Sequence, residues 1–326
     1  MNYRKFTHTN LSCSEVGLGC WQLGGSDWGA VSDQKAYDIL AQAVECGINF
    51  FDTADVYGDG RSESLIGNFL KSTSAPVFVA TKLGRRQIYP NNYTEATTRV
   101  AAEESLKRLQ VESLDLTQLH CVPTEVMRQG DVFEWLRKLK QEGKIKSFGA
   151  SVESLEEAHI CLAQEGLSSL QIIFNVFRQK PISELFEVAK AKSVALIVRL
   201  PLASGLLSGK MTKQSSFAAN DHRNYNRDGQ FFNVGETFAG LPFELGVSLA
   251  NEVSQFMPEG MIMAQWAMRW ILDHDAVTVV IPGATKPQQV ASNALASDLP
   301  PLGEKIHRQL QDFYRQKVVR HIRGPY

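Results

Sequence analysis

The sequence has little of what several specialised protein classes require, beginning with cysteine. There are five cysteines in 326 residues, they lie far apart, and none forms a C-x-x-C pair. An odd number without that spacing argues against a disulfide framework or a zinc site, and no metal is expected. The expected state of Cys13, Cys20, Cys46, Cys121 and Cys161 is therefore small buried thiols in a reducing cytoplasm.

Charge of one sign and long apolar runs are missing as well. The formal net charge is −1, so the sequence carries no electrostatic footprint for nucleic acid. The first ten residues, MNYRKFTHTN, lack the apolar core of a signal peptide. No run of about 18 apolar residues is present that could span a membrane. We therefore expect a cytoplasmic protein with a small-molecule partner and neither nucleic acid nor membrane as a partner, while a homo-oligomer stays open.

The composition is ordinary for a folded soluble protein. Apolar residues make up 44% and charged residues 21% of the chain. The length suits one large domain or two ordinary ones, but no linker rich in Pro, Gly or Ser divides the chain. The prediction is a single domain over residues 1–326, large enough to need no disulfide or metal for stability.

Short apolar runs recur along most of the chain and predict eight strands. An N-terminal hairpin with its turn at Thr9–Asn10 comes before them. The runs are rich in Val, Ile, Leu or Phe and almost free of charge, as parallel strands covered on both faces are. They are Val16–Cys20, Ile48–Asp52, Val77–Lys82, Leu114–Leu119, Ile145–Ala150, Leu170–Phe174, Ala195–Arg199 and Thr278–Ile281.

Helical patterns lie between these runs, apart from one long irregular stretch. The expected helices are Ser32–Glu45, Thr94–Leu109, Met127–Gln141, Glu153–Ala163, Ile182–Ala191, Glu244–Phe256 and Met261–His274. The stretch Ala203–Gly240, after the seventh strand, is long enough for a lid or binding loop. Its basic residues Lys210, Lys213, Arg223 and Arg227 suit a phosphate-bearing ligand and equally suit a solvated loop.

Alternating strands and helices are typical of either a closed (β/α)₈ barrel or an open doubly wound sheet. Polar residues that could do chemistry stand at strand ends: Asp52, Lys82, His120 and Ser151. In a barrel such ends converge on one face, where active sites lie. No strand is followed by the G-x-G-x-x-G fingerprint that a dinucleotide-binding open sheet would carry. Both observations favour an α/β fold of the TIM-barrel type.

Four polar side chains could form one catalytic group. A lysine at the end of a buried strand needs a partner, and Asp52 can serve Lys82 if their strands are neighbours. Tyr57 follows in a Gly-rich loop, and a cation beside a phenol favours the phenolate and lowers its pKa. A donor of this kind suits general acid catalysis, with His120 orienting a substrate oxygen. Singly, each residue has a structural explanation as a cap or rim residue, but the conjunction favours function.

Here the chain resembles the aldo-keto reductase superfamily. FFDTADVYGDGRSESLIG is similar to its signature, VATKLG to its lysine segment and LDLTQLH to its histidine segment. GKIKSFGAS, PLASGLLSGK and IPGATKPQQVASN resemble later family segments in the same order. The matches extend from Gly17 to Asn293, and the long form looks like the bacterial oxidoreductase branch.

The resemblance implies NADP-dependent carbonyl reduction or its reverse. Tyr57 is then the general acid, Lys82 held by Asp52 adjusts its pKa, and His120 orients the carbonyl. The implied cofactor residues are Cys20, Trp21, Asp52, Ser151, Gln171, Arg199, Leu202, Ser204, Leu206, Lys210, Gly283, Lys286, Gln289 and Asn293. The long segment Ala203–Gly240 is expected to cover the cofactor pyrophosphate. The substrate pocket is expected to include Trp21, Trp28, Tyr57, His120 and Val122.

Three positions depart from the family pattern. Val152 stands where the family commonly has an Asn that binds the nicotinamide carboxamide. Arg199 replaces an aromatic residue, so it either stacks on the nicotinamide or pairs with an acidic neighbour or substrate. Gln289 replaces an arginine that grips the 2′-phosphate, and this replacement weakens the preference for NADP over NAD. Lys286 can supply the charge instead, so NADP stays the expected cofactor and NAD the less favoured one.

Two other functions compete with the reductase. One is a cofactor-binding, redox-sensing regulatory subunit with little turnover. The other is a barrel lyase or hydrolase that forms a Schiff base at Lys82. The natural substrate and the physiological direction stay open.

Overall fold

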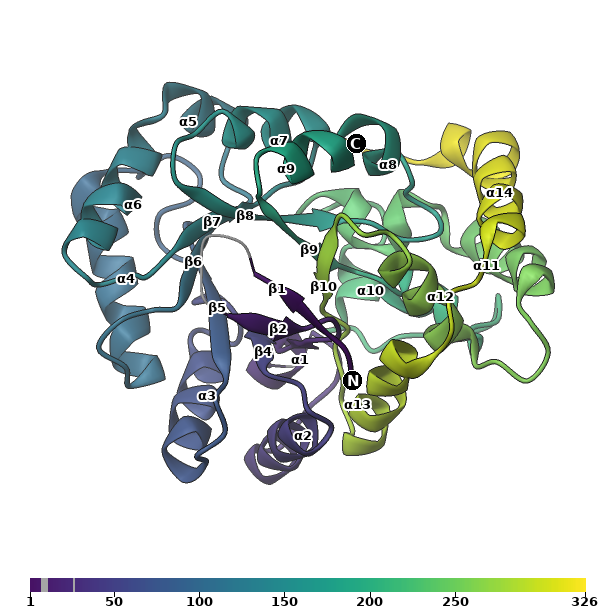
Figure 1. Cartoon of the computed structure of the whole chain (residues 1–326), viewed down its shortest axis with the longest axis horizontal. Helices are drawn as coiled ribbons and strands as arrows, with labels where there is room; N and C mark the ends of the chain where they lie inside the picture. The colour runs from purple at the N-terminus through teal and green to yellow at the C-terminus, as the bar shows by residue number, and fades with distance from the viewer. Residues whose placement is uncertain (7–10, 26) are drawn as a thin grey trace.

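An N-terminal hairpin closes one end of the molecule. The computed structural model describes residues 1–6, 11–25 and 27–326, so the predicted turn at Thr9–Asn10 lies outside the described residues. Strand β1 (Tyr3–Lys5) pairs antiparallel with β2 (Ser12–Ser14). Phe6 and Cys13 are fully buried against apolar residues inside the sheet. The hairpin therefore plugs the end of the sheet opposite the strands' carboxyl ends (Figure 1).

Eight parallel strands form the central sheet in chain order. They are β3 (Leu18–Gly19), β4 (Phe50–Asp52), β5 (Phe78–Leu83), β6 (Leu116–His120), β7 (Phe148–Ser151), β8 (Leu167–Ile173), β9 (Ala195–Arg199) and β10 (Val277–Val280). Almost every strand residue is buried, which agrees with the apolar runs that predicted them. Each predicted strand overlaps an observed one, although several observed strands are shorter.

The two edge strands meet, so the sheet closes into a barrel. Parallel bridges join Val16 to Val280 and Gly19 to Gly283. The Gly17 amide donates to the Val280 carbonyl oxygen at 2.8 Å, and the Val280 amide donates to the Glu15 carbonyl oxygen at 2.9 Å. The (β/α)₈ barrel that the strand-end residues favoured is thus confirmed, and the open doubly wound sheet is excluded.

Helices surround the barrel (Figure 1). The longer ones are α2 (Asp33–Glu45), α3 (Arg61–Ser72), α4 (Glu95–Leu109), α6 (Asp131–Gln141), α7 (Leu155–Leu162), α11 (Phe243–Val253), α12 (Met263–Leu272), α13 (Pro287–Ala294) and α14 (Glu304–Phe313). The short ones are α1 (Trp21–Gly24), α5 (Thr124–Gln129), α8 (Pro181–Glu184), α9 (Phe186–Ala191) and α10 (His222–Tyr225). None of the helices in the described ranges is long and apolar enough to cross a membrane.

Two helical expectations need correction. No helix was expected between the second and third barrel strands, yet α3 forms there and packs on α4. Gly67 lets these helices approach closely, since a Cβ at this position would lie 2.4 Å from the Arg108 carbonyl oxygen. The expected helix Met127–Gln141 is two helices, because Gly130 takes a left-handed φ of 88° between α5 and α6.

The segment after the seventh barrel strand is long, as expected, but it is not wholly irregular. It contains 3-10 turns at Ala203–Ser208, Val234–Glu236 and Phe238–Gly240, and the short helix α10. The C-terminal residues pack against it, since the Arg323 Nε donates to the Gly240 carbonyl oxygen at 2.9 Å. The segment is therefore anchored at both of its ends.

Candidate active site

A cavity of about 600 Å³ opens at the carboxyl ends of the barrel strands. Residues from most of the strand ends and from the long segment contribute to its wall. Of the predicted site residues, the lining includes Cys20, Trp21, Trp28, Asp52, Tyr57, His120, Ser151, Gln171, Arg199, Leu202, Ser204, Lys210, Gly283 and Gln289. Residues far apart in the sequence therefore line one cavity, as expected for a barrel whose strand ends converge on one face.

Lys82 is the centre of a buried hydrogen-bonded group beneath this cavity. Strands β4 and β5 are neighbours, so the carboxylate of Asp52 reaches the Lys82 Nζ at 2.5 Å. The same Nζ donates to the Thr53 carbonyl oxygen at 2.8 Å and lies 3.1 Å from the Tyr57 Oη. Lys82 is 1% exposed and Asp52 2%. All donors of the ammonium are thus used, and the ion pair that the sequence predicted exists.

Close packing of two glycines fixes the loop that carries Tyr57. A Cβ on Gly58 would lie 1.6 Å from the Gly24 carbonyl oxygen, so only glycine permits this contact between the loop and α1. The Trp21 ring stacks on the Tyr57 ring, with centroids 5.9 Å apart and planes inclined by 17°. The phenol is therefore held over Lys82 by backbone contact on one side and an aromatic ring on the other.

The pKa of Tyr57 differs from the expectation. Burial raises the pKa of the phenol to about 12, although the positive charge of Lys82 acts in the opposite direction. For Lys82 itself, burial is the largest influence and lowers the pKa, but Asp52 and Tyr57 together outweigh burial through their charges and hydrogen bonds, and the net shift is upward. At neutral pH the site therefore contains a protonated phenol beside a protonated ammonium.

His120 ends β6 and faces the same chamber. Its ring meets the Tyr57 ring edge-on, with centroids 5.8 Å apart. Burial, followed by the charges of Lys82, Arg85 and Arg199, holds the pKa of the imidazole well below its usual value. The Nδ1 atom is buried and has no hydrogen-bond partner among the described residues. The ring is consequently neutral at physiological pH.

The three positions that would bind a nicotinamide carboxamide are not equivalent here. Ser151 and Gln171 lie opposite each other on β7 and β8, and the Ser151 Oγ is 3.4 Å from the Gln171 Oε1. The Gln171 Nε2 donates to the Asp52 Oδ1 at 2.7 Å, so it braces the buried ion pair. Val152, the third position, offers only its backbone, and its carbonyl oxygen accepts from the Arg199 Nη2 at 3.2 Å.

Arg199 is itself buried and belongs to a cluster of charged side chains beside the cavity whose other members, Arg85, Glu153 and Glu236, are partly buried. Its Nη1 lies 3.2 Å from the Glu236 Oε1, and its Nη2 is 3.7 Å from the Cys121 Sγ. A second pair, Arg85 with Glu153 at 2.9 Å, adjoins it. Of the open possibilities for Arg199, pairing with an acidic neighbour is therefore what the structure has.

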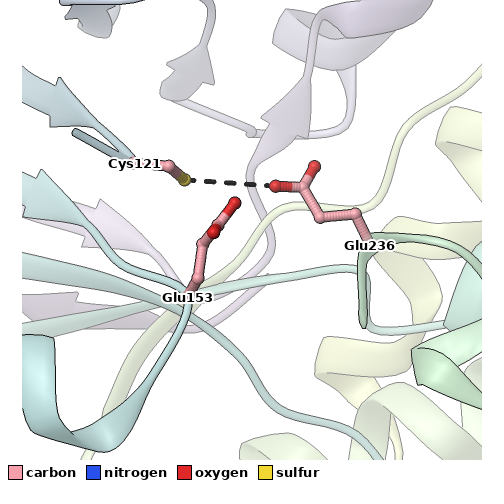
Figure 2. Close-up of side chains that lie close together, drawn as sticks. All are labelled: Cys121, Glu153 and Glu236. Carbon is pink, nitrogen blue, oxygen red and sulfur yellow. Dashed lines mark hydrogen bonds between the residues drawn. The ribbon is translucent and has the colours of Figure 1, made fainter. Parts of the chain in front are cut away.

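Figure 2 shows Cys121, Glu153 and Glu236 pointing toward one another, a set of atoms that can ligate metals. Their ligand atoms lie within 4.8 Å of one another. However, Arg85 and Arg199 already pair with the two carboxylates, and burial raises the pKa of the Cys121 thiol to about 12. We therefore interpret the cluster as an ion-pair network.

The backbone beyond β9 bends closely around the cavity. Leu200, Ala203 and Ser204 take left-handed φ angles of 53°, 48° and 55°. Such angles cost energy for residues with a side chain and are concentrated at ligand sites. The Ser204 Oγ accepts from the Phe238 amide and donates to the Glu236 carbonyl oxygen, both at 3.1 Å. This serine thus connects the two ends of the long segment.

An aromatic and charged rim borders the cavity. The rings of Trp21 and Trp28 meet edge-on, with centroids 5.6 Å apart. Asp27 accepts from the Trp21 Nε1 at 3.1 Å and from the Tyr225 Oη at 3.0 Å. The Arg223 guanidinium lies over the Trp28 ring at 4.9 Å. The rim therefore joins the loop after β3 to the long segment.

Besides Lys82, which lies beneath the cavity, four other predicted site residues do not line it. Val122 is buried against Gly84, and Leu206 is buried against Gly246. Asn293 is 8% exposed on α13, and Lys286 is exposed just before that helix. Gln289 lines the cavity, but its Oε1 caps the helix by accepting from the amides of Thr285 at 2.7 Å and Lys286 at 3.1 Å.

Several cavity residues were not identified from the sequence. Arg85 directly follows the lysine segment, three residues after Lys82, so its place above β5 could have been inferred. Asp27 lies in a loop, Tyr225 ends the short helix α10, and Glu236 ends a 3-10 turn, all in segments without a periodic pattern, so nothing local indicates that they face the cavity. Gln22, by contrast, was expected at the pocket mouth because it follows a strand end; it lines the cavity, and its Oε1 is buried with no hydrogen-bond partner among the described residues.

The hydrogen-bonding and charged groups that line the chamber suit a nicotinamide dinucleotide. Its wall carries the amide and hydroxyl groups of Gln171 and Ser151 and the cations Lys210 and Arg223. The buried, unpartnered Oε1 of Gln22 stands ready to accept a hydrogen bond, for example from a ribose hydroxyl. These groups suit a ligand with an amide at one end and phosphates at the other.

Comparison with known proteins agrees with this chemistry. The profile described as "Aldo/keto reductase family" matches residues 15–315. The chain is 29% identical over 298 residues to Aldo-keto reductase YhdN of Bacillus subtilis (strain 168), covering 89% of this chain and 87% of that protein. It is 27% identical over 317 residues to the NADH-specific methylglyoxal reductase of Escherichia coli (strain K12), covering 89% and 92%.

The fold also has solved relatives. The glycerol dehydrogenase AKR11B4 from Gluconobacter oxydans superposes with a TM-score of 0.80 at 29% sequence identity. The match covers 100% of this chain and 97% of that one. Both the sequence and the barrel are therefore similar, over most of their lengths, to proteins named as reductases and a dehydrogenase.

Proposed function

This chain belongs to the aldo/keto reductase family, and we propose that it is an NADP(H)-dependent oxidoreductase that interconverts an aldehyde or ketone with its alcohol. The observation that carries the proposal is the position of the Lys82 Nζ, 2.5 Å from Asp52 and 3.1 Å from the Tyr57 Oη under the cavity. A buried, charge-supported phenol is a proton donor for a carbonyl oxygen.

The proposed roles follow from the protonation states. When bound, a nicotinamide cofactor supplies the hydride that reaches the carbonyl carbon. Tyr57, whose pKa of about 12 keeps it protonated, donates the proton to the oxygen as negative charge develops there. Lys82 stabilises the phenolate that remains, and the neutral His120 hydrogen-bonds to and orients the substrate oxygen.

NADP is the proposed cofactor, with NAD as the less favoured one. The cations Lys210 and Arg223 on the cavity wall and the exposed Lys286 at its edge support binding of a phosphorylated cofactor. Gln289 offers no charge and is occupied in capping α13. Because the methylglyoxal reductase relative is named as NADH-specific, both cofactors need to be measured.

The Schiff-base reading of Lys82 is not favoured. A nucleophilic lysine needs an amine that is neutral and accessible. Lys82 is 1% exposed, its Nζ has three partners, and Asp52 keeps its pKa high despite burial. The redox-sensing subunit would use the same cofactor site, and only measured turnover separates it from the enzyme.

The test combines binding and turnover. The purified chain is titrated with NADPH and NADH by fluorescence, and small aldehydes and ketones are then scanned as substrates. We expect cofactor binding, preferentially of NADPH, and reduction of at least one carbonyl class. If neither NADPH nor NADH binds, the proposed function is wrong. Binding with no turnover on any carbonyl would favour the regulatory subunit.

A further inference from the structure

Arg199 places a fixed positive charge at the reactive end of the cavity. It ends β9, is 8% exposed and lines the same chamber as Tyr57 and His120. Its charge reaches this site, because Arg199 is among the charges that, after burial, lower the pKa of His120. The guanidinium is therefore within electrostatic range of any group that reacts there.

Three contacts hold the Arg199 guanidinium in place beside the cavity. Its Nη1 pairs with the Glu236 Oε1 at 3.2 Å, and its Nη2 reaches the Val152 carbonyl oxygen at 3.2 Å and the Cys121 Sγ at 3.7 Å. Glu236 is itself held, because its carbonyl oxygen accepts from the Ser204 Oγ at 3.1 Å. The charge thus has one position, set by the barrel on one side and the long segment on the other.

The surrounding charges do not fully cancel it. Arg85 and Arg199 face Glu153 and Glu236 in the charged cluster beside the cavity. Burial and the neighbouring carboxylate of Glu236 raise the pKa of Glu153 to about 7. Near neutral pH part of the molecules therefore hold two guanidiniums against one carboxylate, and the cluster has an excess of positive charge.

We propose that the Arg199–Glu236 pair discriminates between the two redox forms of the nicotinamide, favouring the neutral reduced ring over the positively charged oxidised ring. The inference rests on the proposed function, since it needs a nicotinamide in this cavity. Its physical basis is repulsion between like charges in a chamber of low dielectric constant. The consequence is a site that loads reduced cofactor and works toward carbonyl reduction.

The test measures binding and needs no turnover. Dissociation constants of NADPH and NADP⁺ are determined by fluorescence and calorimetry for the wild type, Arg199→Gln and Glu236→Gln. The informative quantity is the dissociation constant of NADP⁺ divided by that of NADPH, so a high ratio means a preference for the reduced cofactor. Arg199→Gln is expected to lower this ratio about tenfold, and Glu236→Gln, which leaves the guanidinium uncompensated, to raise it.

Two controls isolate the nicotinamide ring. Arg223→Gln removes another paired cation of the same cavity, one that lies over the Trp28 ring and pairs with Asp221, and is expected to change both affinities alike without moving the ratio. The fragment 2′,5′-ADP has no nicotinamide, so Arg199→Gln is expected to leave its affinity unchanged. A merely structural defect would instead weaken the fragment and both cofactors together.

The outcomes separate the two proposals. If Arg199→Gln is too unstable to measure, the double variant Arg199→Gln/Glu236→Gln removes the pair without leaving a buried unpaired Glu236, and it is expected to lower the ratio. Ratios that stay within twofold of wild type in all these variants, with both cofactors still bound, overturn the inference alone. Failure of the wild type to bind either cofactor overturns the proposed function instead.

Discussion

Replacing Lys82 with methionine tests whether one buried ion pair holds the reactive site together. Methionine keeps the unbranched length of the side chain and removes the ammonium. Asp52 is 2% exposed and would retain only the Gln171 Nε2, at 2.7 and 3.3 Å, as a side-chain partner. A carboxylate left alone in this way must either stay charged without compensation or take up a proton.

The expected loss is large for a single substitution. Removing one partner of a buried ion pair costs about 3–5 kcal/mol, because the remaining charge is uncompensated. A typical folded domain is stable by only about 5–15 kcal/mol. The loss also depends on pH: a raised pKa for the orphaned Asp52 means that the folded variant binds a proton that the unfolded chain releases near pH ~4. Stability of Lys82→Met therefore falls further as pH rises above that value.

Urea unfolding at pH 5.5 and pH 8 measures this effect. The set includes the wild type, Lys82→Met, Asp52→Asn and the double variant. The double variant removes both charges and is expected to recover most of the loss. A matched surface control is Lys146→Met, because Lys146 is 63% exposed and pairs with Asp115 at 2.7 Å; it is expected to lose less than about 1 kcal/mol.

Two results would contradict the reasoning. A double variant that loses the sum of the single losses would show that the two side chains act independently. A Lys82→Met protein as stable as the Lys146→Met control would show that burial of the pair has no energetic consequence.

Three further predictions concern other parts of the site. Tyr57→Phe is expected to lower turnover more than about 100-fold while cofactor affinity, followed by fluorescence, stays within twofold; unchanged turnover would remove its role. Glu153 has a folded pKa of about 7 against an ordinary value near 4.5, so wild-type stability should fall between these pH values as the unfolded chain ionises first. Glu153→Gln should reduce this pH-dependent loss in the free energy of unfolding, measured by urea titration, by up to about 3 kcal/mol. If the variant keeps the pH dependence of the wild type, the pKa shift assigned to Glu153 is wrong. Gln289→Arg should lose about 1 kcal/mol of helix capping yet raise affinity for NADPH relative to NADH; a cofactor preference that does not move would place the 2′-phosphate elsewhere.

The barrel was predictable because its strands are buried on both faces and so appear as uncharged apolar runs. The missed helix α3 begins inside the signature segment, where Gly58 and Gly60 make the local pattern resemble a loop. Gly130 divides the expected helix Met127–Gln141, since a left-handed residue cannot continue a helix. A missed helix and a misplaced division between two helices thus both occur where a few glycines decide the local backbone, and they leave the strand ends where they were expected.

The sequence by itself determined which side chains meet. Asp52, Lys82 and His120 end consecutive runs that become neighbouring strands, and strand ends of a barrel must converge, so their proximity follows from the chain order. Their chemical types, with Tyr57 five residues after Asp52, indicate the reaction before any coordinate is known.

Only the tertiary structure decided the electrostatics of the site. The pKa of Tyr57 is a balance in which burial outweighs Lys82, and burial is a property of the whole fold. Arg199 pairs with Glu236 because a long segment without periodicity folds back over the barrel. A local pattern specifies which way a strand or helix faces, whereas the partner of a buried charge depends on the path of every segment around it.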